Sequence, residues 1–146
     1  MIETYTDWSA EDLWQHQQAN FSAHLAMMYA YLSDHDLSPD DFIQYVGERA
    51  APGWRDCRDP HDMLNGILLN VQANGGSVHR ASFNGDHAEA TVAAPVRLEV
   101  MRFYGVPQDL AERTWEKYRP IAEALGLAFS WESAGKDIYR IAISRA

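Results

Sequence analysis

The sequence predicts an α+β fold: an N-terminal three-helix unit packed on a four-stranded antiparallel sheet, in the order ααα-ββ-αα-ββ. Three observations lead to this fold. Helix start signals precede three apolar segments in the first half, the apolar period then shortens to two residues, and Asn84-Gly85 separates two short runs. Two hairpins separated by helices pair most simply into one sheet with a helix-covered face. We expect residues 1–146 to form a single domain.

Each N-terminal helix is expected to begin after a capping residue. Ser9 stands three residues before Asp12, which is a capping-box pattern, and this first helix should run to about Ser33. The next two helices open with Ser38-Pro39 and Asp59-Pro60, where a capping side chain precedes a proline in the first turn. They should end before Pro52 and at Gly75-Gly76, respectively.

The second half alternates between strand and helix patterns. Residues 77–93 give two strands, residues 96–105 a short helix, and Pro107 opens a longer helix that Pro120 should kink or divide. Gly126 should end that helix. The last two strands should turn at residues 133–136 and show an alternating apolar face, formed by Leu127, Phe129, Trp131, Tyr139, Ile141 and Ile143.

Charge and cysteine content restrict the class of partner. The formal net charge of −9 argues against nucleic acid or an anionic membrane as partner, since both attract clustered positive charge. Cys57 is the single cysteine, which excludes an internal disulfide framework and a multi-cysteine zinc site. The chain contains no apolar run of the ~20 residues that a membrane-spanning helix needs. We therefore expect a cytoplasmic protein that does not bind a membrane.

The first helix carries polar residues beside its predicted apolar face. That face is formed by Trp14, Phe21, Leu25, Met28 and Leu32. Gln17, Asn20, His24 and Tyr31 follow one flank of it at helical spacing. An unpaired buried amide or imidazole costs about 1–3 kcal/mol, so each group needs a partner. The flank is either a polar contact between helices that protein groups satisfy or a surface that faces a ligand.

Three further residues are candidates for a second wall of such a site. If Asn84-Gly85 is a two-residue turn, His79 opposes Ala90 on a small apolar face; a three-residue turn would place it outward. Trp54 is either a lid or a loop anchor, and Trp131 either stacks on a ligand or covers the sheet. The predicted ligand-binding set is Gln17, Asn20, Phe21, His24, Met28, Tyr31, Trp54, His79 and Trp131.

The order of elements resembles the superfamily that includes haem-nitric-oxide-binding domains, vinyl-reductase-type sensor domains and TRAPP transport-complex subunits. The resemblance implies a pocket between helices and sheet that holds haem, a fatty-acyl chain or an aromatic effector. Tyr118-Arg119-Pro120 does not match the Tyr-x-Ser-x-Arg motif of the haem branch, and one cysteine does not match the zinc-binding sensors. The stretch LSPDDFIQYVGERAAPGW is similar to bacterial domains grouped near L-2-amino-thiazoline-4-carboxylic acid hydrolases.

Three functions are compatible with these observations. The first is a small-molecule-binding domain, sensor-like or carrier-like, whose apolar pocket takes a hydrophobic or aromatic molecule. The second is a small hydrolase-like enzyme in which His24 is the catalytic acid or base, since an imidazole titrates near neutrality. The third is an acidic protein-interaction module. The residues select no cofactor and predict no metal site. Apolar residues such as Met27 and Ala30 on other sides of the first helix are compatible with a homodimer.

Overall fold

The computed structural model describes residues 7–93 and 96–146 and confirms the α+β fold with a four-stranded antiparallel sheet. Two additional 3₁₀ turns, labelled η, interrupt the helical segments. The elements in chain order are α1 (Ala10–Asp34), α2 (Pro39–Ala50), η1 (Ala51–Trp54), α3 (Pro60–Ala73), β1 (Val78–Asn84), β2 (His87–Ala93), α4 (Leu98–Phe103), α5 (Gln108–Arg113), η2 (Thr114–Lys117), α6 (Tyr118–Ala124), β3 (Leu127–Gly135) and β4 (Ile138–Arg145).

The three predicted helix caps are confirmed. The side chains of Ser9, Ser38 and Asp59 each accept a hydrogen bond from the backbone N–H three residues later. Each bond satisfies one of the N–H groups that have no partner inside the helix. The caps therefore set the start of α1, α2 and α3 without help from distant parts of the chain.

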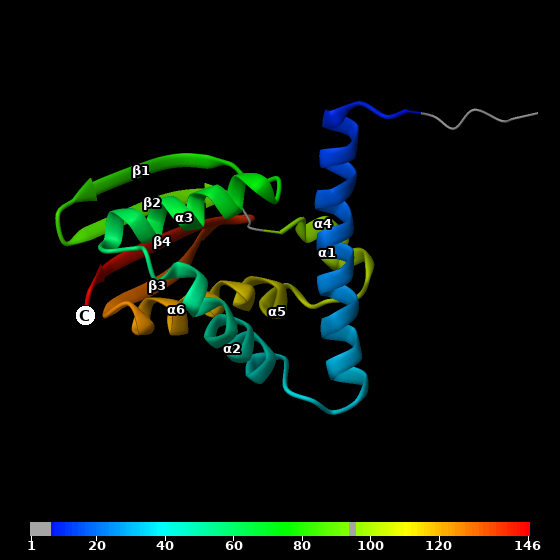
Figure 1. The fold of residues 1–146 in the computed structure, drawn as a ribbon. Coiled ribbons are helices and arrows are strands. Elements are labelled where there is room, and N and C mark those ends of the chain that lie inside the picture. The colour runs from blue at the N-terminus through cyan, green and yellow to red at the C-terminus, as the bar shows by residue number, and fades with distance from the viewer. Residues whose placement is uncertain (1–6, 94–95) are drawn as a thin grey trace, which may run out of the picture.

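The sheet has the order β1-β2-β4-β3, and one of its faces is covered by α3 and α6 (Figure 1). The inward residues of the two central strands are neighbours, as in the pairs Ala90–Ile141 and Val92–Tyr139. All four of these side chains are buried. They pack with Trp115 of η2 and with the inner faces of α3 and α6. Side chains therefore fill the space between helices and sheet, where the resemblance implied a pocket.

The register of the first hairpin differs from the prediction. Asn84 pairs with His87, so the two-residue turn is Gly85-Asp86 and not Asn84-Gly85. A bulge between Val78 and Arg80 takes His79 out of the pairing, and its exposed ring lies 3.1 Å from the Ser77 hydroxyl. The expected pairing of His79 with Ala90 is therefore wrong, because the shifted turn pairs Ala90 with Ala81, and the bulge leaves His79 without a partner strand residue. The second hairpin turns at residues 136–137, later than expected.

The predicted division of the longer C-terminal helix is confirmed. The helix breaks into α5, η2 and α6, and the 3₁₀ turn η2 comes directly before the turn that contains Pro120. Proline has no N–H to donate, and its ring collides with the carbonyl four residues earlier. Gly47 of α2 packs on this break, where a Cβ atom would clash with the Lys117 carbonyl and the Pro120 ring. The absent side chain at position 47 thus brings α2 close to η2.

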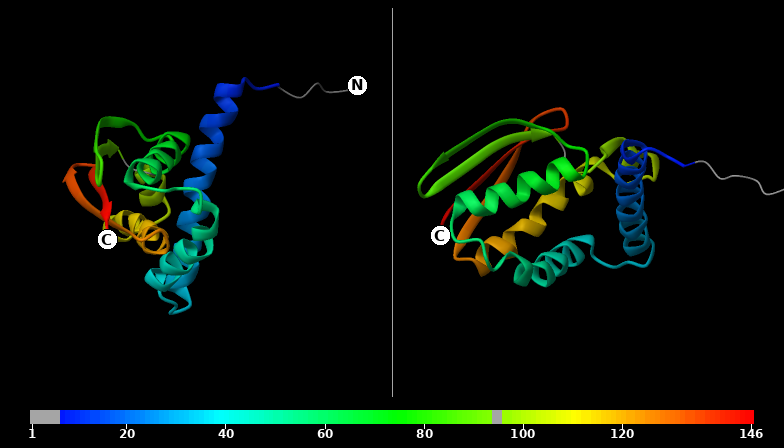
Figure 2. Two further views of the ribbon diagram at one scale, coloured as in Figure 1. Left: turned by 60° about the vertical axis from the view of Figure 1, so that its left-hand side comes forward. Right: turned by 45° about the horizontal axis from the view of Figure 1, so that its top comes forward.

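Helix α1 stands at one end of the molecule and packs mainly on α4, with α2 against its C-terminal half (Figures 1 and 2). Its buried residues are Gln18, Ser22, Ala26 and Tyr29. The predicted apolar face is therefore wrong for Trp14, Phe21 and Met28, which are all exposed, while Leu25 and Leu32 are half-buried. Within the described residues, no helix combines the length and apolar character needed to cross a membrane.

Hydrogen bonds to distant backbone explain why polar and small residues form the buried face of α1. The Ser22 hydroxyl accepts a 2.9 Å hydrogen bond from the Arg97 N–H, just before α4. The Gln18 amide donates over 3.3 Å to the Ala73 carbonyl at the end of α3. Ala26 adds a small side chain without any exposed surface. Small and hydrogen-bonded residues allow α4 and α3 to approach α1 closely, and this turns the large apolar residues toward the surface.

Candidate functional site

An apolar groove lies between α1 and α2 and ends at η2; we call it the α1–α2 groove. Its volume is about 280 Å³. Ligand sites are typically concave and mostly apolar, with a few polar groups that orient the ligand. The lining residues come from α1 (Phe21, His24, Leu25, Met28, Tyr29), α2 (Phe42, Ile43, Val46) and η2 (Thr114, Lys117).

The buried end of the groove contains one satisfied polar pair. The Tyr29 hydroxyl lies 2.8 Å from the Thr114 Oγ1, and both side chains are buried. Burial raises the pKa of Tyr29, so its phenol remains protonated and can act as a hydrogen-bond donor. The Phe42 ring packs edge-on against the Tyr29 ring, with 6.3 Å between the ring centroids. This end of the groove is thus closed by aromatic rings and one internal hydrogen bond.

His24 is the imidazole at the groove, and its hydrogen bond fixes its tautomer. Its Nδ1 lies 2.7 Å from the backbone carbonyl of Asn20, one turn earlier in α1. A carbonyl oxygen only accepts, so Nδ1 carries the hydrogen and the neutral ring has its lone pair on Nε2. The side chain is exposed. Nε2 is therefore available to accept a hydrogen bond from a bound molecule or to take a proton.

Lys117 is the one positively charged residue among the described residues that line the groove. Its ammonium group lies 5.0 Å from the centroid of the Tyr118 ring, a distance at which a cation is attracted to an aromatic face. Within residues 7–93 and 96–146, Lys117 forms no ion pair. Its flexible side chain can therefore turn toward an anionic group in the groove without giving up a carboxylate partner.

A second hollow continues the groove along α1 toward the C-terminal end of the helix. Its volume is about 340 Å³, and it shares His24, Met28 and Phe42 with the groove. Met27, Tyr31 and Leu32 complete its walls. The two hollows therefore lie next to each other along α1, with His24, Met28 and Phe42 between them.

Four of the nine predicted ligand-binding residues meet in this region. Phe21, His24 and Met28 line the α1–α2 groove, and Tyr31 lines its continuation. The expected hollow beside His24 is therefore present, but it lies between two helices on the surface and not between helices and sheet. The neighbouring apolar side chains of Phe21 and Met28 stay exposed because the buried face of α1 is centred on Ser22.

The structure does not bring the other five residues to the groove. Asn20 lines a separate depression beside α4, and Gln17 is exposed on α1. Trp54 packs edge-on against Tyr118, with ring centroids 5.8 Å apart, which is the anchoring role. The Trp131 indole donates a 2.8 Å hydrogen bond to Glu116 and covers the core below it. His79 lies on the β1 bulge, as described above.

Sequence reasoning missed the side chains on α2 and η2 that complete the groove. Phe42, Ile43 and Val46 share one face of α2 at helical spacing, and that signal was present in the sequence. Thr114 and Lys117 carry no such signal. They reach the groove only because Gly47 lets α2 approach η2 at the break in the C-terminal helix.

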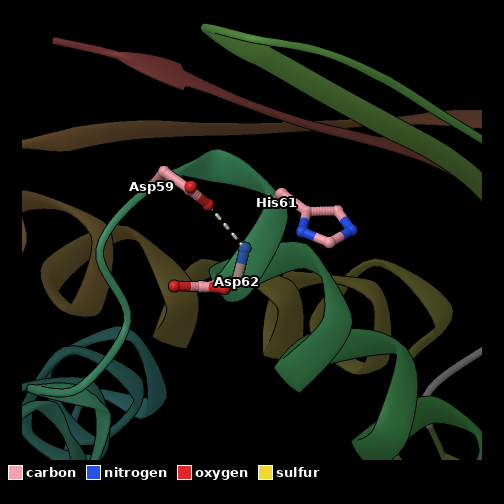
Figure 3. A group of neighbouring side chains, drawn as sticks. All are labelled: Asp59, His61 and Asp62. Atoms are coloured by element: carbon pink, nitrogen blue, oxygen red, sulfur yellow. Dashed lines mark hydrogen bonds between the residues drawn. The ribbon is translucent and has the colours of Figure 1, made fainter.

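A group of possible metal ligands lies at the start of α3. One ligand atom from each of Asp59, His61 and Asp62 lies within 4.8 Å of the others (Figure 3). Asp59 caps the helix, and the Asp62 carboxylate accepts from the Arg58 backbone N–H over 3.0 Å, which lowers the pKa of Asp62. The His61 ring points away from both carboxylates and packs edge-on against Phe83, at 4.4 Å between centroids. These contacts already give each group a structural role.

Comparisons with known proteins add no family assignment to this geometry. No protein-family model matches the chain, and a search of curated proteins returned no match. The functional conclusion therefore depends on the α1–α2 groove itself.

Proposed function

We propose that the protein binds a small hydrophobic or aromatic molecule in the α1–α2 groove, as a sensor-like or carrier-like domain. The observation that carries this proposal is an apolar hollow of about 280 Å³ whose lining includes the side chain of His24 and the residue Lys117. Pockets for drug-sized ligands typically span ~300–1,000 Å³, so the groove alone suits a compact molecule. A longer molecule would extend into the adjoining hollow beyond His24.

The polar groups of the groove favour a ligand with one acidic group. His24 offers Nε2, and the Lys117 side chain could turn its ammonium group from the Tyr118 ring toward the groove, while the rest of the lining is almost entirely apolar. A carboxylate held by Lys117, with an aromatic ring or a short alkyl chain against Phe21, Ile43 and Met28, would satisfy both parts of the site. We therefore propose aromatic and aliphatic monocarboxylic acids as the ligand class.

Thermal unfolding in the presence of such acids tests the proposal. A ligand present at about 100 times its dissociation constant adds ~2.7 kcal/mol to the free energy of unfolding. For a chain of this size, that free energy raises the melting temperature by about 5–10 °C. If no aromatic or aliphatic acid raises the melting temperature of the wild-type chain, the ligand class is wrong.

Two adjacent residues of α2 provide a matched pair of variants. Val46 lines the groove, whereas Tyr45 is exposed and lies outside it. Val46→Trp should fill the groove and remove the ligand-dependent shift, while Tyr45→Trp should retain it. Melting temperatures without ligand show whether both variants fold. Equal ligand responses in the two variants would place the binding site elsewhere.

A hydrolase-like activity is the second candidate, supported by the tautomer of His24. With Nδ1 donating to the Asn20 carbonyl, the neutral ring presents the lone pair of Nε2 as a possible base on the groove side of α1. Such a base would activate a water molecule beside a bound ester or amide. Hydrolysis of a panel of activated aryl esters should then be lost in His24→Ala with the melting temperature retained. Activity that survives in His24→Ala would reject this role.

Two further proposals concern relatives and location. Membership of the superfamily that the element order resembles is supported by the helices packed on paired hairpins, and location in the cytoplasm by the single cysteine.

The acidic interaction module has less support, because the acidic residues are dispersed along the chain. If the chain bound a basic protein with an affinity that fell steeply with salt, that result would support the interaction module.

We also propose that the chain forms a homodimer. The supporting observation is the number of large apolar side chains that α1 leaves exposed, among them Leu13, Met27 and Tyr31. Apolar surface of this kind on a folded protein typically marks an interaction site. Light scattering during gel filtration should give twice the 16.5 kDa mass of one chain.

A further inference from the structure

The exposed side of α1 lacks the charged residues that a solvent-facing helix normally carries. Residues 13–33 contain no Asp, Glu, Lys or Arg. A surface helix usually places charged and polar residues opposite its buried face. The centres of protein interfaces instead are depleted of charge and enriched in aromatic residues and methionine. The composition of α1 is therefore that of a helix covered on both sides.

The residues opposite the buried face follow the spacing of a helix-pairing surface. We define the outer stripe as the exposed α1 residues that succeed one another in steps of four and three: Leu13, Gln17, Asn20, His24, Met27 and Tyr31. At ~100° per residue they lie roughly 140–180° from Ser22, the centre of the buried face. Alternating steps of three and four are the a and d positions of a coiled coil, where another helix packs.

Aromatic and apolar side chains flank the outer stripe on both sides. Phe103 and Tyr104, at the end of α4, adjoin Asn20, and Phe103 is 82% exposed. Trp14, Phe21 and Met28 lie on the other flank. With the apolar members of the stripe, these residues are 41–82% exposed. Aromatic side chains bury roughly 150–250 Å² each; taking about 200 Å² for each of the eight residues, of which about half is exposed, the surface offers on the order of 800 Å² per chain. A standard stable interface buries about 800 Å² per partner.

From these observations we infer that the outer stripe pairs antiparallel with the outer stripe of a second copy, about a two-fold axis at position 22. This inference gives the geometry of the proposed homodimer and therefore rests on it. With the axis at position 22, the numbers of two residues that face each other across the interface add up to 44. The stripe then pairs with itself throughout: Leu13 faces the partner's Tyr31, Gln17 faces the partner's Met27, and Asn20 faces the partner's His24.

The polar centre of the stripe favours the antiparallel arrangement over a parallel one. His24 uses Nδ1 for the Asn20 carbonyl of its own chain, which leaves Nε2 to accept from the amide of the partner's Asn20. Two such bonds, related by the axis, would satisfy the imidazoles in the middle of the interface. A parallel pair would set His24 against His24 and align the two helix dipoles unfavourably. Polar residues at these positions are known to fix register in helix pairs.

The placement of α1 in the fold leaves room for a second copy. The sheet, α3 and α6 lie to one side of α1 (Figures 1 and 2), and α4 crosses α1 on the side of Ser22, so the outer stripe faces away from these elements. An antiparallel partner would therefore place its own body on the far side. His24 belongs to the outer stripe and to the wall of the α1–α2 groove, so the partner helix would also border the mouth of the groove.

Charge substitutions test whether this face forms the dimer. His24→Glu would place two carboxylates next to the axis, and we expect the light-scattering mass to fall to that of one chain. The matched control is Gln15→Glu, an exposed α1 residue outside the stripe, which should keep the dimer mass. A wild-type chain that stays monomeric at sub-millimolar concentration rejects the homodimer. A His24→Glu chain that stays dimeric, with an unchanged circular dichroism spectrum, moves the interface to another face.

Cysteine cross-linking distinguishes the two orientations. In a Cys57→Ser background, chains with Leu13→Cys and chains with Tyr31→Cys are treated with a short thiol cross-linker, alone and mixed. Antiparallel pairing predicts cross-linked species only in the mixture, because like positions lie about 27 Å apart along the helix at ~1.5 Å per residue. Cross-linking of each chain alone would establish a parallel pair and overturn the inferred register while leaving the homodimer intact. Val46 lines the groove and does not belong to the outer stripe, so Val46→Trp should keep the dimer mass. Loss of ligand binding in this variant can therefore be distinguished from loss of the dimer.

Discussion

The Tyr29 hydroxyl and the Thr114 Oγ1 lie 2.8 Å apart and join α1 to η2 at the buried end of the α1–α2 groove. The two residues are 85 positions apart in the chain, so this bond fixes the relative placement of two distant helical segments. Because both side chains are buried, neither hydroxyl has water as a substitute partner. The bond should therefore contribute to the stability of the fold and to the shape of the groove.

Removing either hydroxyl should destabilise the protein. Tyr29→Phe and Thr114→Val each leave one buried hydroxyl without a partner, and we expect each to cost about 1–3 kcal/mol of unfolding free energy. The double variant should cost less than the two losses added together, by at least about 0.5 kcal/mol. Urea unfolding followed by tryptophan fluorescence measures all four chains. Strictly additive losses would show that the two hydroxyls act independently.

Replacing Gly47 by alanine should weaken the contact between α2 and η2. The added methyl group would clash with the Lys117 carbonyl and the Pro120 ring, and forcing extra volume into a packed site typically costs about 1–3 kcal/mol. Alanine is also the better helix former, which offsets up to ~1 kcal/mol of that loss. Gly53→Ala is the control, since a Cβ atom there meets no atom within 4 Å. A Gly47→Ala chain as stable as the control would contradict the close packing.

Acid should remove the stabilisation that Glu116 provides. Hydrogen bonds from Arg119, and then from the Trp131 indole, lower the pKa of Glu116 below that of an unfolded glutamate, about 4.3. A lowered folded pKa adds stability above the unfolded pKa, and that stability is lost as pH falls through the folded value. Glu116→Gln should therefore be less stable than wild type at neutral pH and converge with it in acid. A stability difference that is constant with pH would contradict the role of the Glu116 charge. Because solvent screens the Glu116–Arg119 pair, we expect the difference to be small.

Cys57 should react slowly with alkylating agents in the folded protein. Burial raises the pKa of its thiol, and the nearby carboxylates of Asp62, Asp56 and Asp59 raise it further. Since the thiolate is the nucleophile, less of the reactive form is present at neutral pH. Mass spectrometry after iodoacetamide treatment should show slower modification than in the urea-unfolded chain. Equal rates in the two states would show that the folded environment leaves the thiol unaffected.

Much of the fold could be predicted from the sequence, because the signals are local. Ser9, Ser38 and Asp59 act on N–H groups three residues away, and Pro120 acts on the turn before it. The alternation of Ala88, Ala90 and Val92 placed these side chains on the inward face of the sheet. The hairpin register was predicted wrongly by one residue at the turn, because Asn84-Gly85 and Gly85-Asp86 are both acceptable two-residue turns.

The sequence by itself determined that α1 is a long helix with no charge between residues 13 and 33, and that large apolar side chains surround it. Which side of α1 is buried was decided by the tertiary structure alone. Ser22 and Gln18 find their partners at Arg97 and Ala73, far along the chain, and no helical period encodes those contacts. The same contacts turned Phe21, His24 and Met28 outward, where α2 could form a groove beside them.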